Sequence, residues 1–157
     1  MARKFIYLLS LFLLALITGV FWGTWFTLTR SIEDFSPDEF IHIGKVIISN
    51  VAIPMRIIMP LGILFMLLSV LIYRQKGTVG FYTGVLSLVL VIAVLLITLI
   101  VLVPIDNDIK AWTASSLPAD FEAIRLKWKN FHAARTFLSL ASFLCFTFFM
   151  LNDRDKR

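Results

Sequence analysis

Long uncharged stretches alternate with short polar segments along this chain. The stretches without a charged residue are residues 5–29, 57–73, 77–105 and 136–152. Each is close in length to the roughly 20 apolar residues that cross a bilayer as a helix. The pattern predicts one all-α domain over residues 1–157, an integral membrane four-helix bundle with spans at about residues 5–29, 53–74, 79–104 and 131–151. The segments 30–52 and 105–130 are then two loops on one side of the membrane, here termed the outer side.

The first outer loop carries a helix signal. Ser36-Pro-Asp-Glu39 has the spacing of a capping box, with proline at the first helical position. We therefore expect an amphipathic helix over about residues 37–50, lying on the membrane surface or capping the bundle. Pro54 and Pro60 follow, and proline inside a membrane helix favours a kink at the start of the second span.

The second outer loop lies between a segment with helix-ending residues and a segment with helix-starting residues. Pro104-Ile-Asp-Asn-Asp108 is expected to end the third helix. Ser115-Ser-Leu-Pro118 is expected to begin the fourth helix. A fourth helix over residues 118–151 would be roughly 50 Å long, whereas the hydrocarbon core is about 30 Å thick. The sequence thus predicts a long fourth helix that projects outward from the membrane.

The first span follows Arg3 and Lys4, a positive start that signal peptides share. Its apolar run is longer than that of a usual signal peptide, and no small-x-small cleavage site follows it, so we expect it to remain as an anchor. Gly19 and Gly23 within it have the small-xxx-small spacing of close helix contacts.

Composition agrees with this pattern and excludes other classes. Hydrophobic residues make up 59% of the chain and charged residues only 16%, values far from those of soluble domains. The net charge of +5 is not gathered in a tract that would indicate nucleic acid. Cys145 is the only cysteine, so a disulfide or CxxC redox centre within the chain is excluded.

The distribution of charge predicts the orientation of the bundle. The side that holds both termini has seven basic residues against Asp153 and Asp155, whereas the two outer loops have six basic and eight acidic residues. Basic residues near span ends favour the cytoplasmic side. We therefore expect a multi-pass protein of the cell membrane with both termini cytoplasmic. The seven basic residues are Arg3, Lys4, Arg74, Lys76, Arg154, Lys156 and Arg157.

Candidate chemistry concentrates at the start of the fourth span. Arg125, Trp128, His132 and Arg135 are three, four and three residues apart, so they share one face of a helix. Ionisable residues at membrane depth are by default a sign of a functional site. The sequence places Arg125 and Trp128 above the membrane and His132 and Arg135 at its rim.

Two further charges are expected at the same depth. Arg56 opens the second span and Asp106 closes the third. A carboxylate near a helix C-terminus is disfavoured by the helix dipole, so Asp106 is expected to pair with Arg135, Arg56 or His132. A neutral histidine can accept a proton, and arginines can hold an oxyanion. No metal site is expected, because the chain has only two histidines and lacks metal-ligand spacing.

Several motifs, most of them in the final third of the chain, carry a likeness to a known family. They are Met55-Arg-Ile-Ile-Met-Pro60, Val103-Pro-Ile-Asp-Asn107, Trp112, Leu117-Pro-Ala-Asp-Phe121, Arg125-Leu-Lys-Trp128 and Phe131-His-Ala-Ala-Arg135. Over nearly its whole length the chain resembles a four-helix integral membrane family of mostly uncharacterised bacterial proteins that includes the fungal anthrone oxygenases. The resemblance implies a four-helix bundle and, for the fungal members, insertion of oxygen into an anthrone without a cofactor.

Two classes of function follow. As an enzyme, the protein would use His132 as the base and Arg135 with Arg56 as an oxyanion clamp. Membrane lipid and a hydrophobic aromatic small molecule are its expected partners. In the non-catalytic alternative, the same pocket binds a lipid head group or a small anion, or the bundle is a scaffold for a membrane complex. The residues expected to bind the substrate are Trp112, Trp128, Arg125, Asp106 and Asn107.

Overall fold

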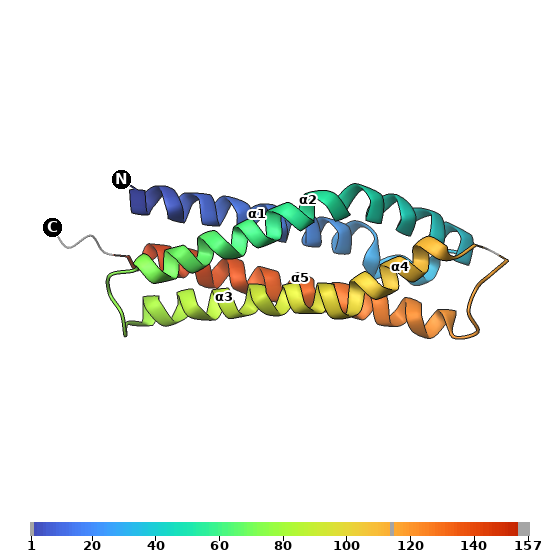
Figure 1. The fold of residues 1–157 in the computed structure, drawn as a ribbon. Coiled ribbons are helices and arrows are strands. Elements are labelled where there is room, and N and C mark those ends of the chain that lie inside the picture. Colours follow the sequence, from blue (N-terminus) through green and yellow to red (C-terminus); the bar gives the residue numbers. More distant parts are fainter. Residues whose placement is uncertain (1, 114, 154–157) are drawn as a thin grey trace.

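The computed structural model describes residues 2–113 and 115–153, so the predicted inner-side cations Arg154, Lys156 and Arg157 lie outside the described residues. The described residues form helices and connecting turns (Figure 1). In chain order the elements are α1 (Ala2–Thr27), the 3-10 helix η1 (Thr29–Asp34), α2 (Pro37–Ile72), α3 (Val79–Ile97), the π-helical turn η2 (Thr98–Leu102), α4 (Val103–Ala111) and α5 (Phe121–Leu151).

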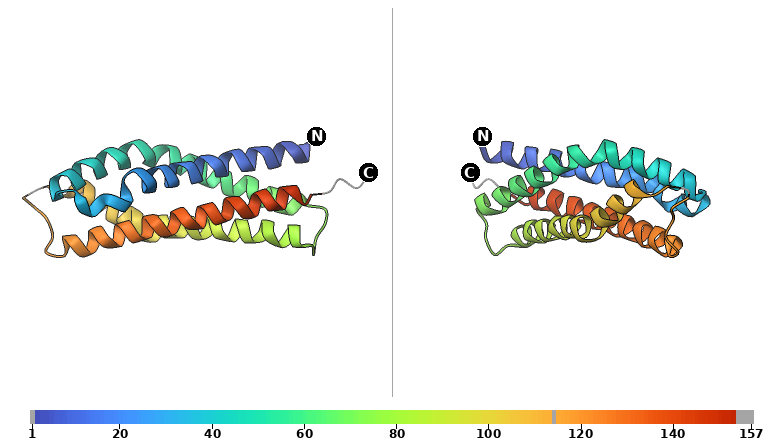
Figure 2. Two further views of the ribbon diagram at one scale, coloured as in Figure 1. Left: turned by 180° about the vertical axis from the view of Figure 1, so that it is seen from behind. Right: turned by 45° about the vertical axis from the view of Figure 1, so that its right-hand side comes forward.

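The helices run lengthwise beside one another as a four-helix bundle, which both views of Figure 2 show. Four helical stretches within the described residues are long and apolar enough to cross a membrane. This confirms the all-α class and is consistent with a membrane four-helix bundle. The start of α1 and the end of α5 lie at the same end of the bundle in Figure 1. The turns around η1 and between α4 and α5 lie at the opposite end, here called the outer end.

Helix α2 begins as predicted but does not end there. Ser36 and Glu39 form the capping box: the Ser36 amide donates to Glu39 Oε2 at 2.8 Å, and the Glu39 amide donates to Ser36 Oγ at 3.4 Å. The separate amphipathic helix expected over residues 37–50 is wrong, because α2 continues through Pro54 and Pro60 to Ile72. The helix arches along its length (Figure 2), which is how a continuous helix accommodates prolines that lack an amide donor.

The expected end of the third helix at Pro104 is also wrong. The helical path continues from α3 through η2 into α4 and ends at Ala111. In η2 the chain widens into a π-helical turn, where the Val103 amide donates to the Thr98 carbonyl. This wide turn directly precedes Pro104, which would otherwise press its ring against the carbonyl four residues earlier. The continuation places Asp106 inside a helix rather than at its end.

Helix α5 is unbroken over 31 residues, but it does not project alone. The beginning of α2, all of α4 and η1 reach the same end of the bundle and pack against it (Figure 1). Trp128 is 1% exposed there, although the sequence placed it in water above the membrane. Because η1, the start of α2, α4 and the start of α5 meet at this end, an outer apolar cluster forms that includes Ile32, Phe40, Ile109, Trp112, Phe121 and Trp128.

Small and hydroxylated residues allow the helices to approach closely. Ser87 on α3 and Ser142 on α5 exchange hydrogen bonds, each hydroxyl donating to the other residue's carbonyl at 2.7 and 2.8 Å. A Cβ added at Gly84 would lie 2.5 Å from the Phe149 ring, so α3 and α5 touch there. The contact expected at Gly19 and Gly23 is wrong, since an added Cβ at either would meet nothing within 4 Å.

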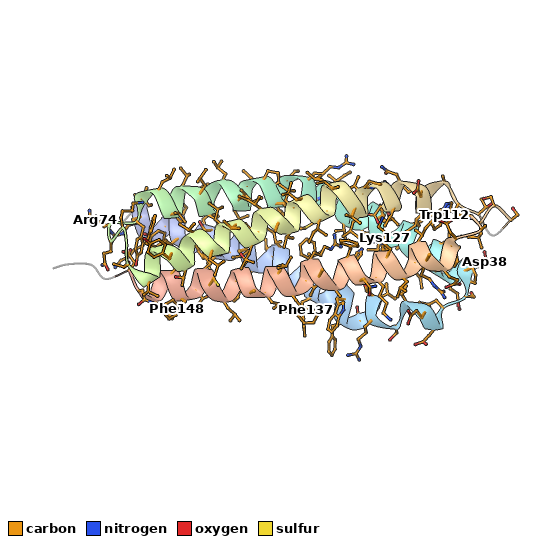
Figure 3. All side chains as sticks on the ribbon, turned by 90° about the horizontal axis from the view of Figure 1, so that it is seen from below. Asp38, Arg74, Trp112, Lys127, Phe137 and Phe148 are labelled. Carbon is orange, nitrogen blue, oxygen red and sulfur yellow. The ribbon has the colours of Figure 1, made fainter. Side chains whose placement is uncertain are left out.

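The surface has the polarity of a membrane protein. Phe137 and Phe148 lie along α5 and are 51% and 46% exposed (Figure 3). Arg74 lies at the end of the bundle opposite the outer end, and Asp38 and Trp112 lie at the outer end (Figure 3). Apolar side chains thus cover the length of the bundle, as contact with lipid requires.

Candidate functional site

A cavity of about 400 Å³ lies inside the outer half of the bundle. Its walls come from all four long helical paths: Phe21 of α1, residues 47–60 of α2, residues 95–110 of the α3 to α4 path, and residues 128–135 of α5. Cavities of this size hold drug-sized ligands. The cavity therefore lies where the sequence expected the polar rim.

The walls are apolar and the cavity opens on one side. Phe21 and Met59 are buried, with 2% and 3% exposure, and form part of its inner surface. By contrast, the lining residues Pro60 on α2 and Leu99 on η2 are exposed. The exposed lining residues belong to α2 and to the α3 to α4 path. The opening therefore lies between these two helices, on the side of the bundle.

Two buried polar side chains of α5 stand at the inner wall. Arg135 Nη2 lies 2.9 Å from His132 Nδ1 and 3.5 Å from His132 Nε2. The Arg135 guanidinium also lies over the ring of Phe21, with its Cζ 4.4 Å from the ring centroid. Arg135 Nε is buried and has no hydrogen-bond partner among the described residues. Arg135 also lines the cavity, and the N–H groups of a guanidinium can donate to an anionic oxygen.

Asp106 stands on the opposing helix α4 and is held by Trp128. The indole Nε1 donates to Asp106 Oδ1 at 2.9 Å. The Trp128 ring also packs on His132, with ring centroids 3.9 Å apart. The expected pairing of Asp106 with Arg135, Arg56 or His132 is therefore wrong as a direct contact: none of the three hydrogen-bonds to Asp106 or forms an ion pair with it among the described residues. The pairing was expected for an aspartate at a helix C-terminus, but Asp106 lies in the first turn of α4.

Cations stand at the opening. Arg56 and Lys110 both line the cavity and are both exposed, one from each of the helices that flank the opening. Lys110 Nζ donates to the exposed Asn107 Oδ1 at 3.1 Å. An anionic ligand would meet positive charge both at the opening and at the inner wall.

Six of the eight residues expected to form the site line this one cavity: Arg56, Asp106, Asn107, Trp128, His132 and Arg135. The structure places Trp112 and Arg125 elsewhere. Trp112 packs on Phe121, with ring centroids 5.8 Å apart. Arg125 donates to the Phe35 carbonyl at 2.8 Å and pairs with Glu122 at 2.6 Å. These two residues fasten the outer cluster and the turn after η1, and their contacts are structural.

The sequence reasoning missed Lys110 and the apolar wall. Val103, Asp106, Asn107 and Lys110 follow the helical spacing of three, four and seven residues from the first of them. This spacing puts the four residues on one face only if the helix continues past Pro104, and the sequence was expected to end the helix there.

The fold and the cavity together define a helical membrane protein with a polar, cationic pocket in an apolar wall. The profile of the anthrone oxygenase family matches residues 50–145, more than half of the chain. The chain belongs to this family. The match contains every polar residue that lines the cavity, from Arg56 to Arg135. No curated protein and no solved structure matches the chain. Within the described residues, no three His, Cys, Asp or Glu side chains come together as metal ligands.

Proposed function

We propose that this protein is a membrane oxidoreductase that inserts oxygen into a flat aromatic ketone of the anthrone type, within the cavity between α2, α4 and α5. The observation that carries the proposal is the buried Arg135 and His132 pair at the wall of a mostly apolar cavity. Membership of the anthrone oxygenase family supports the reaction class.

The shape and polarity of the cavity support an apolar, mostly flat substrate. Met55 and Met59 of α2, together with Leu95 and Val103 of the α3 to α4 path, line the cavity. Methionine adapts to irregular surfaces and packs well on aromatic rings. A polycyclic ketone would lie between these walls, with its carbonyl oxygen toward Arg135.

The reaction balances with molecular oxygen as the only co-substrate. Loss of a proton from the ring CH₂ of an anthrone gives an enolate whose negative charge lies on the carbonyl oxygen. The enolate reduces oxygen and forms a C–O bond to it, and the resulting hydroperoxide loses water to give the quinone. Donors that hold the enolate oxygen lower the barrier to the first step, since the charge develops there.

The side opening supports access from the membrane. Exposed Pro60 and Leu99 flank the opening at positions where the bundle surface is apolar. A polycyclic ketone partitions into lipid, so it would reach the cavity without crossing water. We further propose that both termini are cytoplasmic, which places the cavity toward the outer leaflet.

The test is oxygen consumption and quinone formation by purified protein supplied with anthrone, with the protein-free rate subtracted. Wild type should accelerate the reaction. The variants Arg135→Gln and His132→Phe should lose most of that acceleration, about 100-fold or more for an oxyanion donor. Arg30→Gln is the control, because Arg30 is exposed and lies outside the cavity. A wild-type rate equal to the protein-free rate would refute the proposal.

A non-catalytic role has one observation in its favour. Arg56 and Lys110 place two exposed cations at the opening, an arrangement that also suits the head group of an anionic lipid. In that case native mass spectrometry should show bound lipid that is lost in an Arg56→Gln, Lys110→Gln double variant. Anthrone turnover would then be absent in every variant.

A further inference from the structure

The hydrogen bond between Arg135 and His132 determines what the imidazole can do. A guanidinium has only N–H donors and stays charged in proteins, so the nitrogen it contacts must accept. The closer contact is to Nδ1, at 2.9 Å. A neutral His132 therefore carries its proton on Nε2. With Nδ1 occupied and Nε2 protonated, His132 has no free lone pair with which to take a proton from a substrate.

Asp106, unlike His132, has a free lone pair that can accept a proton. It is the only carboxylate among the described residues that line the cavity. One of its oxygens, Oδ1, accepts from Trp128 Nε1, and no described residue donates a hydrogen bond to the other oxygen. Asp106 is only partly buried, so its carboxylate borders the open volume. A carboxylate held through one oxygen keeps the second available as a base.

Trp128 contacts both Asp106 and His132 and so fixes their relative positions. Its Nε1 fixes Asp106 at 2.9 Å, and its ring packs on His132 at 3.9 Å between centroids. A base at one place and oxyanion donors at another are what the enolisation of a cyclic ketone requires, as when an aspartate acts against an oxyanion hole in ketosteroid isomerase. In an anthrone the acidic CH₂ and the carbonyl stand on opposite sides of one ring.

We infer that Asp106 is the catalytic base of the proposed oxygenation, and that His132, through Nε2–H, and the Arg135 guanidinium are the oxyanion donors. The inference rests on the proposed function. Asp106 Oδ2 takes a proton from the ring CH₂, and the C–H electron pair moves onto the carbonyl oxygen. After oxygen adds to the ring carbon, Asp106 returns that proton to the distal peroxide oxygen.

The same carboxylate completes the reaction. It removes the second proton from the ring carbon, and the C–H electrons form the new C=O bond as the O–O bond breaks. The leaving hydroxide takes this proton and departs as water. The sum is anthrone and oxygen to anthraquinone and water, with no other reductant or oxidant.

The deciding experiment separates proton removal from oxygen chemistry. Purified protein is incubated with anthrone in D₂O without oxygen, and deuterium entering the CH₂ group is measured by mass spectrometry. Asp106→Asn should lose about 100-fold or more of the protein-dependent exchange, the usual contribution of a general base. Asp108→Asn is the matched control, because it makes the same change on α4 outside the cavity lining and should keep the wild-type rate.

A second measurement distinguishes a missing base from a damaged site. Binding of 2-hydroxyanthracene, a flat phenol without an acidic CH₂, reports on the oxyanion donors. Asp106→Asn should bind it as well as wild type or more tightly, because a nearby negative charge is removed. Arg135→Gln should bind it more weakly. If the Asn variant does not fold, Asp106→Ala replaces it, and added formate should then restore exchange.

The outcomes separate the two hypotheses. Wild-type protein that neither oxygenates anthrone nor exchanges its protons refutes the proposed function itself. Active wild type with undiminished exchange in Asp106→Asn overturns the role of Asp106 and leaves the oxygenase standing. Phenol binding without any formate rescue in Asp106→Ala overturns it as well.

Discussion

The bond from Trp128 to Asp106 makes a prediction that stability measurements can test. Trp128→Phe keeps an aromatic ring against Phe40 and His132 but removes the Nε1–H donor. Hydrogen bonds to charged groups contribute about 1.5–3 kcal/mol in soluble proteins. Polar contacts between membrane helices average about 0.6 kcal/mol and reach about 1.7. Since Asp106 is charged yet partly exposed, we expect the bond to contribute about 1–2 kcal/mol.

A double-mutant cycle isolates this value from the packing that Trp128→Phe also changes. Unfolding by sodium dodecyl sulfate in mixed micelles, followed by far-ultraviolet circular dichroism, gives free energies for Trp128→Phe, Asp106→Ala and the double variant. The coupling between the two sites should be about 1–2 kcal/mol. Trp112→Phe is the matched control: Trp112 also belongs to the outer cluster, but its indole N–H donates to no described residue, so its coupling to Asp106 should be near zero.

The reasoning would be refuted by a coupling between Trp128 and Asp106 below about 0.5 kcal/mol, which is the usual error of additivity. A second refutation is a larger coupling of Asp106 to Arg56. The sequence allowed that pair, but the structure shows no direct contact between the two. Either result would mean that Asp106 is positioned by something other than the indole.

Two further predictions concern packing and orientation. Gly84→Ala should destabilise the bundle by about 1–3 kcal/mol, because its Cβ would lie 2.5 Å from the Phe149 ring. Gly19→Ala should be tolerated, since an added Cβ there meets nothing within 4 Å. The same unfolding assay measures both variants, and equal losses of stability would contradict the contact between Gly84 and Phe149. In a cysteine-free background, Ser115→Cys should react with a membrane-impermeant maleimide on intact cells and Arg74→Cys should not, and the reverse pattern would invert the proposed topology.

Much of the fold could be predicted because lipid imposes a simple rule. A helix in hydrocarbon cannot carry unpaired charges, so uncharged runs mark the spans directly. What the rule does not supply is where helices end outside the hydrocarbon. Proline in an exposed chain indicates a helix boundary, so the sequence predicts a helix that ends at Pro104 and a separate helix that begins at Pro37. Both helices continue: the turns of α4 pack in the outer cluster, and the turns of α2 around Val51 and Met55 pack against Phe21 of α1 and its neighbours.

The candidate site was predictable to the extent that it follows helical spacing. Trp128, His132 and Arg135 are buried on one face of α5, as their separation indicates. Trp112 lies at the end of α4, where backbone direction rather than spacing decides which way a side chain points. The hydrogen bond between Trp128 and Asp106 joins residues 22 apart in sequence on two helices, and no local pattern could have predicted it.

The position of Asp106 favours a catalyst over a receptor for anions. A buried guanidinium such as that of Arg135 is costly unless an anion or acceptors compensate it, so its place in the cavity wall favours an anionic guest. A simple anion receptor would gain nothing from a carboxylate on the same cavity, because it repels the guest. A site that must first create its anion by removing a proton needs both charges, separated so that they do not neutralise each other. The absence of a direct ion pair between Asp106 and Arg135, with the carboxylate bound to Trp128 instead, meets that requirement.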